Sequence, residues 1–133
     1  MLAIDTNLIV RFLVKDHPAQ STKANALIGS DDVFVSSTVV LETAWVLRSV
    51  YGFSNDQLGA ALAAFGGLPR VTLEEPATVA QALDWTKGGL DFADALHLAK
   101  ARGCEGFVSF DRKFAKAANR VSDVKVRVFE RLD

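Results

Sequence analysis

The sequence has only one cysteine, and it has no long hydrophobic run. Its single cysteine, Cys104, excludes an internal disulfide bond and any zinc or iron–sulfur site built from cysteines. The longest apolar stretches are far shorter than the ~20 residues that a membrane-spanning helix needs. The acidic residue Asp5 follows a short apolar start, so we expect no signal peptide. These absences predict a soluble protein with a cytoplasmic location and no membrane partner.

The apolar content of the chain is enough to build a sizeable core. The chain has 133 residues, of which 50% are hydrophobic and 23% charged, and its formal net charge is −1. This length is typical of one domain, and this composition excludes a disordered or fibrous protein. We therefore expect a single domain that spans residues 1–133.

The near-neutral net charge hides an uneven distribution along the chain. Residues 1–110 carry 8 basic and 12 acidic side chains, a sum of −4, whereas residues 111–133 carry 7 basic and 4 acidic side chains, a sum of +3. One interpretation is an ordinary solvated surface at the end of the chain. The other is a positive surface beside an acidic site, which suits a polyanionic partner. The sequence leaves both open.

Short apolar segments alternate with longer segments of helical periodicity. The expected strands are residues 2–4, 33–35, 71–73, 107–109 and 124–128. The expected helices cover about residues 6–13, 18–29, 38–50, 56–66, 76–87, 91–102 and 111–118. Such an alternation predicts an α/β fold with a mainly parallel sheet that is covered by helices on both faces.

The helix expected at residues 38–50 is apolar around almost its whole circumference, which predicts a buried helix. Its one acid, Glu42, shares a narrow polar sector with Thr38 and Ser49. A buried carboxylate without a partner is costly, and Arg48 points roughly 120° away on an ideal helix. We therefore expect Glu42 to need a cation from elsewhere.

Four further acids lie at strand ends or helix starts. Asp5 follows the first strand and Asp111 the fourth, while Asp91 and Asp94 are separated by three residues on one helix face. Each has a structural alternative, since Asp91 and Asp111 are also good N-caps. In α/β sheets, however, ligands bind beyond the carboxyl ends of the strands. Together with Glu42, these acids are expected to form a cluster of negative charges that a divalent cation would neutralise.

The type of ligand indicates the type of metal. Oxygen-only donors favour Mg²⁺ or Mn²⁺ over zinc or copper. The two histidines do not support a zinc site, because His17 precedes a proline at a helix start and His97 lies about 60° from Asp94, away from Asp91. Carboxylate-held magnesium that activates water for attack on phosphorus is typical of a nuclease.

The sequence resembles the PIN-domain ribonucleases, and among them the VapC-type toxins of bacterial toxin–antitoxin pairs. The resemblance covers essentially the whole chain, and its strength comes from four marks in the right order. These marks are Ile4-Asp5-Thr6-Asn7, Glu42 within an apolar helix, Asp91-Phe92-Ala93-Asp94-Ala95-Leu96, and Ser109-Phe110-Asp111.

The resemblance implies a fold and a set of site residues. The fold would be a PIN-like three-layer α/β/α sandwich with a central, mainly parallel sheet. The catalytic and metal-binding acids would be Asp5, Glu42, Asp94 and Asp111, with Asp91 as a supporting ligand. Small polar residues that orient the acids or bind water would be Thr6, Asn7 and Ser109.

The resemblance also implies an activity and partners. The expected activity is Mg²⁺- or Mn²⁺-dependent endoribonuclease cleavage of a structured RNA, such as transfer RNA or ribosomal RNA. The expected partners are a VapB-type antitoxin, which inhibits the toxin, and a second copy of the chain in a homodimer.

The chain departs from the family pattern at one position. Many members carry a further acid two residues beyond the fourth aspartate, whereas this chain has Lys113 there, after Arg112. The departure leaves open whether one or two metal ions bind. It also places cations next to Asp111, so we expect Arg112, Lys113 and Lys116 to contact RNA phosphates.

Other functions compete with this interpretation. One is a catalytically idle PIN-like module that binds RNA or protein, since ligands alone do not prove activity. Another is a receiver-like signalling domain, which would need paired acids after the first strand, where Asp5 is followed by Thr6. A phosphoryl-transfer enzyme of the haloacid dehalogenase type would need an aspartate where Asn7 stands.

Two expectations concern surfaces. The homodimer is expected to form through the helices of residues 38–66, where Tyr51, Phe53 and Phe65 are either partly exposed or fill the core of the monomer. Cys104 is expected to pack as a small apolar residue rather than to react.

Overall fold

The computed structural model describes residues 1–129, and the last four residues of the expected domain 1–133 lie outside this range. The chain divides into two compact units, residues 1–76 and residue 77 onward. The strands of each unit pair within that unit, and every pairing is parallel.

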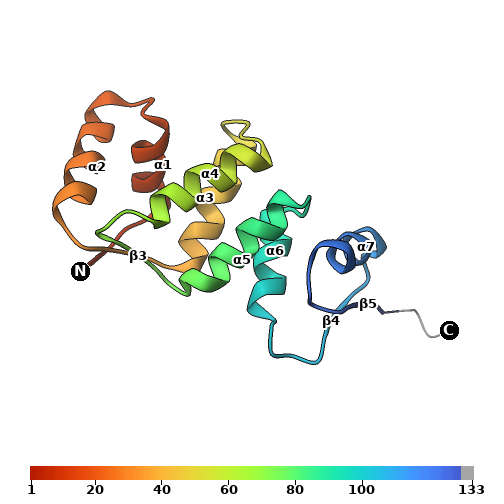
Figure 1. The fold of residues 1–133 in the computed structure, drawn as a ribbon. Coiled ribbons are helices and arrows are strands. Elements are labelled where there is room, and N and C mark those ends of the chain that lie inside the picture. The colour runs from red at the N-terminus through yellow and green to blue at the C-terminus, as the bar shows by residue number, and fades with distance from the viewer. Residues whose placement is uncertain (130–133) are drawn as a thin grey trace. The chain divides into compact units, whose positions relative to one another are not determined.

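The first unit contains a three-stranded parallel sheet and four helices (Figure 1). Its strands are β1 (Leu2–Ala3), β2 (Val33–Val35) and β3 (Val71–Leu73), in the order β1-β2-β3. Its helices are α1 (Thr6–Val14), α2 (Pro18–Ser30), α3 (Ser37–Ser49) and α4 (Asn55–Gly66). The helices α1 and α2 lie side by side, and α1 also packs on α3.

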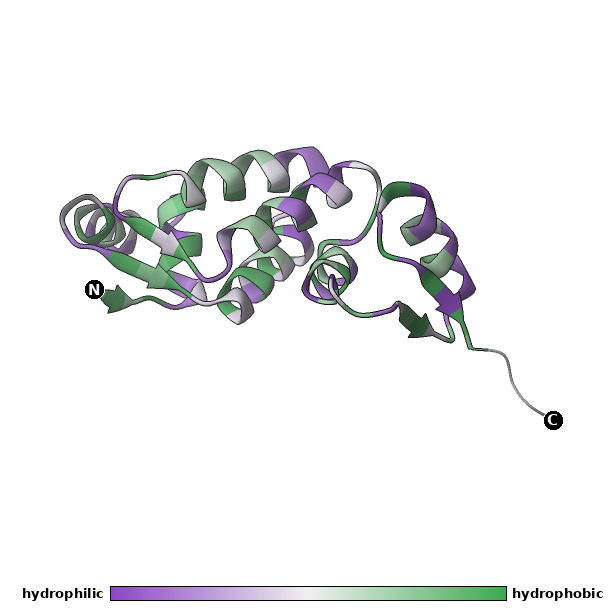
Figure 2. Ribbon diagram, turned by 60° about the horizontal axis from the view of Figure 1, so that its bottom comes forward, coloured by the Kyte–Doolittle hydropathy of each residue, from purple (hydrophilic) through white to green (hydrophobic). Residues whose placement is uncertain are grey.

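The core of this unit forms around the central strand. Val33 and Val35 of β2 point to the same face of the sheet and are completely buried, whereas Phe34, which points to the other face, is half-buried. From the helices, Ile9 and Leu58 are buried beside the sheet layer, and the ring of Phe12 on α1 lies 5.8 Å from the ring of Phe65 on α4. In Figure 2, the strands of this unit are coloured mainly as hydrophobic residues. Burial of such side chains stabilises the unit by about 1.5–3 kcal/mol each.

The second unit begins within α5 (Pro76–Lys87), one residue after the start of this helix, and continues with α6 (Phe92–Lys100). They are followed by β4 (Phe107–Ser109), α7 (Arg112–Val121) and β5 (Val126–Val128). The two strands pair in parallel, and α7, which connects them, packs on β5. The side chain of Asn119 on α7 fixes this arrangement, because it accepts a hydrogen bond from the Val126 amide and donates one to the Val126 carbonyl.

The predicted order of strands and helices is confirmed throughout, and so is the α/β class with parallel strands. The boundaries differ by a few residues, since the first strand ends at Ala3 and the last begins at Val126. Among the described residues, no helix is both long and apolar enough to cross a membrane; the longest have 13 residues.

The prediction that residues 38–50 form a buried helix is wrong. Helix α3 buries one face, with Val40 and Leu47 among its buried residues, while Trp45 is 65% exposed and Val50 is 64% exposed. Glu42 is exposed as well. An apolar composition all round does not determine how many faces a helix covers, and here the fold covers only one.

The structure also tests the predicted exposure of Cys104 and of three aromatic side chains. Cys104 is exposed, so the prediction that it packs as a small apolar residue is wrong; it lies in the irregular segment between α6 and β4, where no element covers it. Phe65 is buried in the core of its unit, whereas Tyr51 and Phe53 are half-buried. Phe65 therefore presents no surface for a partner.

Candidate functional site

Asp5 lies at the junction between β1 and α1. It is the N-cap of α1, and its Oδ1 accepts a hydrogen bond from the Leu8 amide at 3.1 Å. The strand ends at Ala3, so the chain turns into the helix directly after the carboxyl end of β1. The second carboxylate oxygen has no hydrogen-bond partner among the described residues, and the side chain is exposed. Asp5 is therefore held in place with one oxygen available for a ligand.

Glu42 is brought to the same region of the first unit by Thr6. The buried hydroxyl of Thr6 donates a hydrogen bond of 2.5 Å to Glu42 Oε1, and Thr6 directly follows Asp5. The contact joins the start of α1 to the middle of α3. The sequence argument for Glu42 as a buried carboxylate is thus wrong, because the side chain is exposed and already has a neutral donor. Arg48 does not contact it; its guanidinium donates to the Phe53 carbonyl.

A pocket of about 330 Å³ lies between α1 and α2, next to Asp5. Leu8 and Leu27 are among its apolar walls, and its polar lining includes Asn7 and Lys23. Asn7, expected from the sequence to support the acids, thus lies at this pocket. Lys23 on α2 could not be predicted from the sequence, because only the packing of α2 on α1 places it here.

In the second unit, Asp91 and Asp94 occupy the first turn of α6. Asp91 is the N-cap, and its Oδ2 accepts from the Ala93 amide at 3.1 Å. Asp94 is half-buried, while Leu98, one turn further along, is completely buried. Along this face of α6, the side chains therefore pass from exposed at Asp91 to half-buried at Asp94 and completely buried at Leu98.

The electrostatic environment of Asp94 is unfavourable to its charge. Partial burial raises the pKa of its carboxyl above the ordinary value, and the nearby charge of Asp91 raises it further; His97 opposes the shift, and Asp111 adds to it. Asp111 therefore lies close enough to Asp94 for the two carboxylates to repel each other. The negative charges of Asp91 and Asp111 thus both act on Asp94, and the effect of Asp91 is the larger.

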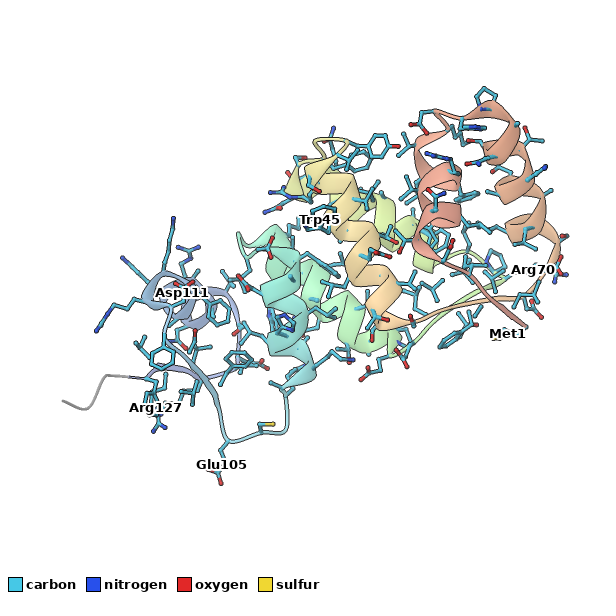
Figure 3. The ribbon with its side chains drawn as sticks, turned by 180° about the vertical axis from the view of Figure 1, so that it is seen from behind. Met1, Trp45, Arg70, Glu105, Asp111 and Arg127 are labelled. Atoms are coloured by element: carbon cyan, nitrogen blue, oxygen red, sulfur yellow. The ribbon has the colours of Figure 1, made fainter. Side chains whose placement is uncertain are left out.

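Asp111 begins α7 directly beyond the carboxyl end of β4 (Figure 3). It is the N-cap, and its Oδ1 accepts from the Phe114 amide at 3.0 Å. Ser109, expected as a supporting residue, accepts a hydrogen bond from the Asp111 amide through its hydroxyl oxygen at 3.0 Å. These two hydrogen bonds hold the backbone amide of Asp111 and the backbone amide of Phe114, three residues further on.

Basic side chains follow this acid on α7. Arg112, Lys113 and Lys116 are all exposed, and Ala115 and Ala118 form the buried face of the helix. Figure 2 shows hydrophilic and hydrophobic stretches alternating along α7. The predicted cations are therefore solvent-facing, as contact with phosphate would require.

The two histidines have the places that the sequence indicated. His17 is the N-cap of α2, and its Nδ1 accepts from the Gln20 amide. His97 is exposed and acts on Asp94 only through its charge.

Across the part of the chain that the structure describes, no three His, Cys, Asp or Glu side chains are grouped closely enough to form a metal site. The first unit brings Asp5 and Glu42 to one region through Thr6, and the second brings Asp91, Asp94 and Asp111 into electrostatic range. All five groups are carboxylates, which is the chemistry that hard divalent cations prefer. In its donor type, the set fits Mg²⁺ or Mn²⁺.

Comparison with known proteins identifies the family. The PIN domain family matches residues 2–120, a range that contains every acid discussed above. PIN domains are commonly nucleases, act on nucleic acids and generally use divalent metal ions. No curated protein matches the chain. The match covers most of the sequence and agrees with the α/β fold and its parallel strands, and the chain therefore belongs to the PIN domain family.

Proposed function

We propose that the protein is a Mg²⁺- or Mn²⁺-dependent endoribonuclease, in which Asp5, Glu42, Asp94 and Asp111 hold the cation. The observation that carries this proposal is the family match, because residues 2–120 include all four acids. The charge crowding around Asp94 supports it, since a cation would relieve the repulsion from Asp91 and Asp111.

In this proposal, different residues bind the cation and orient the acids. The carboxylates bind the cation, and Asp91 adds negative charge beside Asp94 as a supporting ligand. Thr6 and Ser109 orient the acids, the first by donating to Glu42 and the second by fixing the backbone at Asp111. A bound divalent cation supplies electrostatic stabilisation of the charge that develops on the phosphodiester during hydrolysis.

The cations of α7 provide the affinity for RNA in this proposal. Arg112, Lys113 and Lys116 are exposed and follow Asp111 directly in the chain. Contacts between such side chains and phosphates release counterions and make binding salt-dependent.

The test is a cleavage assay with the purified chain and a mixture of transfer and ribosomal RNA. Cleavage is expected with Mg²⁺ or Mn²⁺, and none with EDTA or with the Asp5→Asn variant. Sequencing of the new RNA ends would identify the substrate and the cut site. Equal cleavage by the wild-type chain and Asp5→Asn would contradict the proposal.

We further propose that this nuclease is the toxin of a toxin–antitoxin pair and acts as a homodimer under the control of a VapB-type antitoxin. The support is the resemblance over the whole chain. Expression of the wild-type chain should arrest bacterial growth, and Asp5→Asn should not. A small protein encoded by the neighbouring gene should restore growth, and its failure to do so would argue for a nuclease that acts without an antitoxin.

A catalytically idle RNA-binding module is the second candidate. The observation that favours it is that Asp5, Asp91 and Asp111 all serve as helix N-caps, which is a sufficient structural reason for each. RNA binding without cleavage under any metal would support this second function.

A further inference from the structure

Two exposed phenylalanine rings lie together beside the candidate acid of the second unit. Phe110 follows β4 and is 78% exposed, and Phe129 follows β5 and is 47% exposed. Their ring centroids are 5.6 Å apart with an interplanar angle of 71°, an edge-to-face arrangement. The Phe129 amide donates a hydrogen bond of 2.7 Å to the Ser109 carbonyl, which ties the two strand ends to each other.

This pair is unusual because it is apolar and exposed, and because charged residues follow Phe110 in the chain. Large aromatic side chains are normally buried, since leaving one in water forfeits about 1.5–3 kcal/mol. The edge-to-face contact covers at most one face of the Phe110 ring, so the other face is free. The ring pair therefore leaves one apolar face of Phe110 open, a surface that the fold of this unit does not use for its own core.

We propose that Phe110 and Phe129 are a stacking platform for an unpaired base of single-stranded RNA. Stacking on an aromatic side chain is the usual way in which proteins hold an unstacked base, whatever its sequence. The inference rests on the proposed function and specifies its substrate: an RNA that is single-stranded or looped at the site of binding.

The charges around the rings favour RNA over an apolar protein partner. Asp111 is the next residue after Phe110, and Arg112 and Lys113 follow it with exposed side chains. A base stacked on Phe110 brings its own phosphate among these cations and towards the Asp111 carboxylate. Aromatic rings interleaved with basic residues are typical of surfaces that bind single-stranded nucleic acid.

The test is the affinity of the full chain for a short, unstructured, fluorescently labelled RNA, measured in Ca²⁺ at several salt concentrations. Phe110→Ala should weaken binding by about 5-fold to 150-fold, which corresponds to ~1–3 kcal/mol for one stacked base. Its dependence on salt should stay unchanged, because a ring releases no counterions. Phe110→Trp should bind like the wild-type chain.

Two control variants make the result specific. Val108→Ala removes another exposed apolar side chain from the same strand, 48% exposed, and should leave the affinity unchanged. Arg112→Ala should lower the salt dependence by about one counterion, unlike the phenylalanine variant. Because Phe110 is exposed and loses only its contact with Phe129, its replacement should shift the thermal unfolding midpoint by no more than a few degrees, and a larger shift would indicate misfolding.

The possible outcomes separate this inference from the proposed function. Equal affinity of Phe110→Ala and the wild-type chain overturns the stacking platform, whether or not the wild-type chain cleaves RNA. A change from dimer to monomer in Phe110→Ala, without loss of RNA affinity, also overturns it and shows an interface between copies. Loss of affinity in that variant, with no cleavage by the wild-type chain, supports the platform and refutes the nuclease.

Discussion

Replacement of Asp5 by asparagine and by alanine separates its structural role from its chemical role. As the N-cap of α1, Asp5 satisfies the Leu8 amide, and asparagine can accept the same hydrogen bond without the charge. Alanine can neither accept this hydrogen bond nor carry a charge. If Asp5 is a metal ligand, both variants lose cleavage; if it is only a cap, only alanine has an effect, and that effect is on stability.

The expected stabilities follow from the contact. Asp5→Ala should lower the free energy of unfolding by about 1 kcal/mol, the typical cost of a lost N-cap. For a chain of this size, that loss shifts the thermal midpoint by about 4 °C. Asp5→Asn keeps the hydrogen bond and loses only part of the interaction with the helix dipole, so its unfolding free energy should stay within about 0.5 kcal/mol of the wild-type value.

The assay combines urea unfolding with RNA cleavage in Mg²⁺ for both variants and for one control. The control is Ser54→Ala, which removes the N-cap of α4, another helix of the same unit, at a residue that carries no charge. It should lose a similar amount of stability and keep its cleavage activity below the unfolding transition. Retained cleavage by Asp5→Asn, with normal stability, would refute the assignment of Asp5 as a catalytic acid.

Three further predictions concern the first unit. Thr6→Val removes the hydroxyl that donates to Glu42 and should lower cleavage about 10–100-fold, whereas Thr6→Ser should restore it; equal activity of the two variants would exclude the positioning role. Leu58→Ala, at a completely buried position, should cost about 2–5 kcal/mol in urea unfolding, and a smaller loss would mean that the core collapses around it. The hydrogen bond from Tyr51 to Asp16 lowers the pKa of that carboxyl, so its contribution to stability is present at neutral pH and is lost as the pH falls through the folded-state pKa. Tyr51→Phe should therefore be less stable than the wild-type chain at neutral pH and not in strong acid.

The order of elements was predictable because local signals mark both ends of most segments. The helices begin at side chains that cap them, such as Ser54 with its reciprocal partner Gln57, and these caps are visible in the sequence. The same signals identified Asp91 and Asp111 as helix starts, and both are N-caps in the structure. Local chemistry alone fixes these features, so the sequence is enough to find them.

The degree of burial was less predictable, because it depends on which elements pack together. An apolar circumference at residues 38–50 predicted a buried helix, but only one face of α3 is covered, and Trp45 and Glu42 are exposed. Likewise, Phe110 is exposed although Phe65 is buried. A sequence signal existed only for Phe110, since it stands between the polar residues Ser109 and Asp111.

The capping role of Asp5, Asp91 and Asp111 is compatible with the proposed metal binding, and it predicts that one capping acid would not suffice to hold a cation. A cap uses one carboxylate oxygen and fixes the other in space, so the side chain loses little entropy when it binds a ligand. The same position lies at the positive end of a helix dipole, which stabilises the carboxylate by about 0.3–1 kcal/mol and repels a cation by a comparable amount. A single capping aspartate is therefore a weak cation ligand. Additional carboxylates that do not cap a helix, such as Glu42 and Asp94, would offset this repulsion. Their replacement by neutral amides should weaken Mn²⁺ binding more than replacement of any one cap.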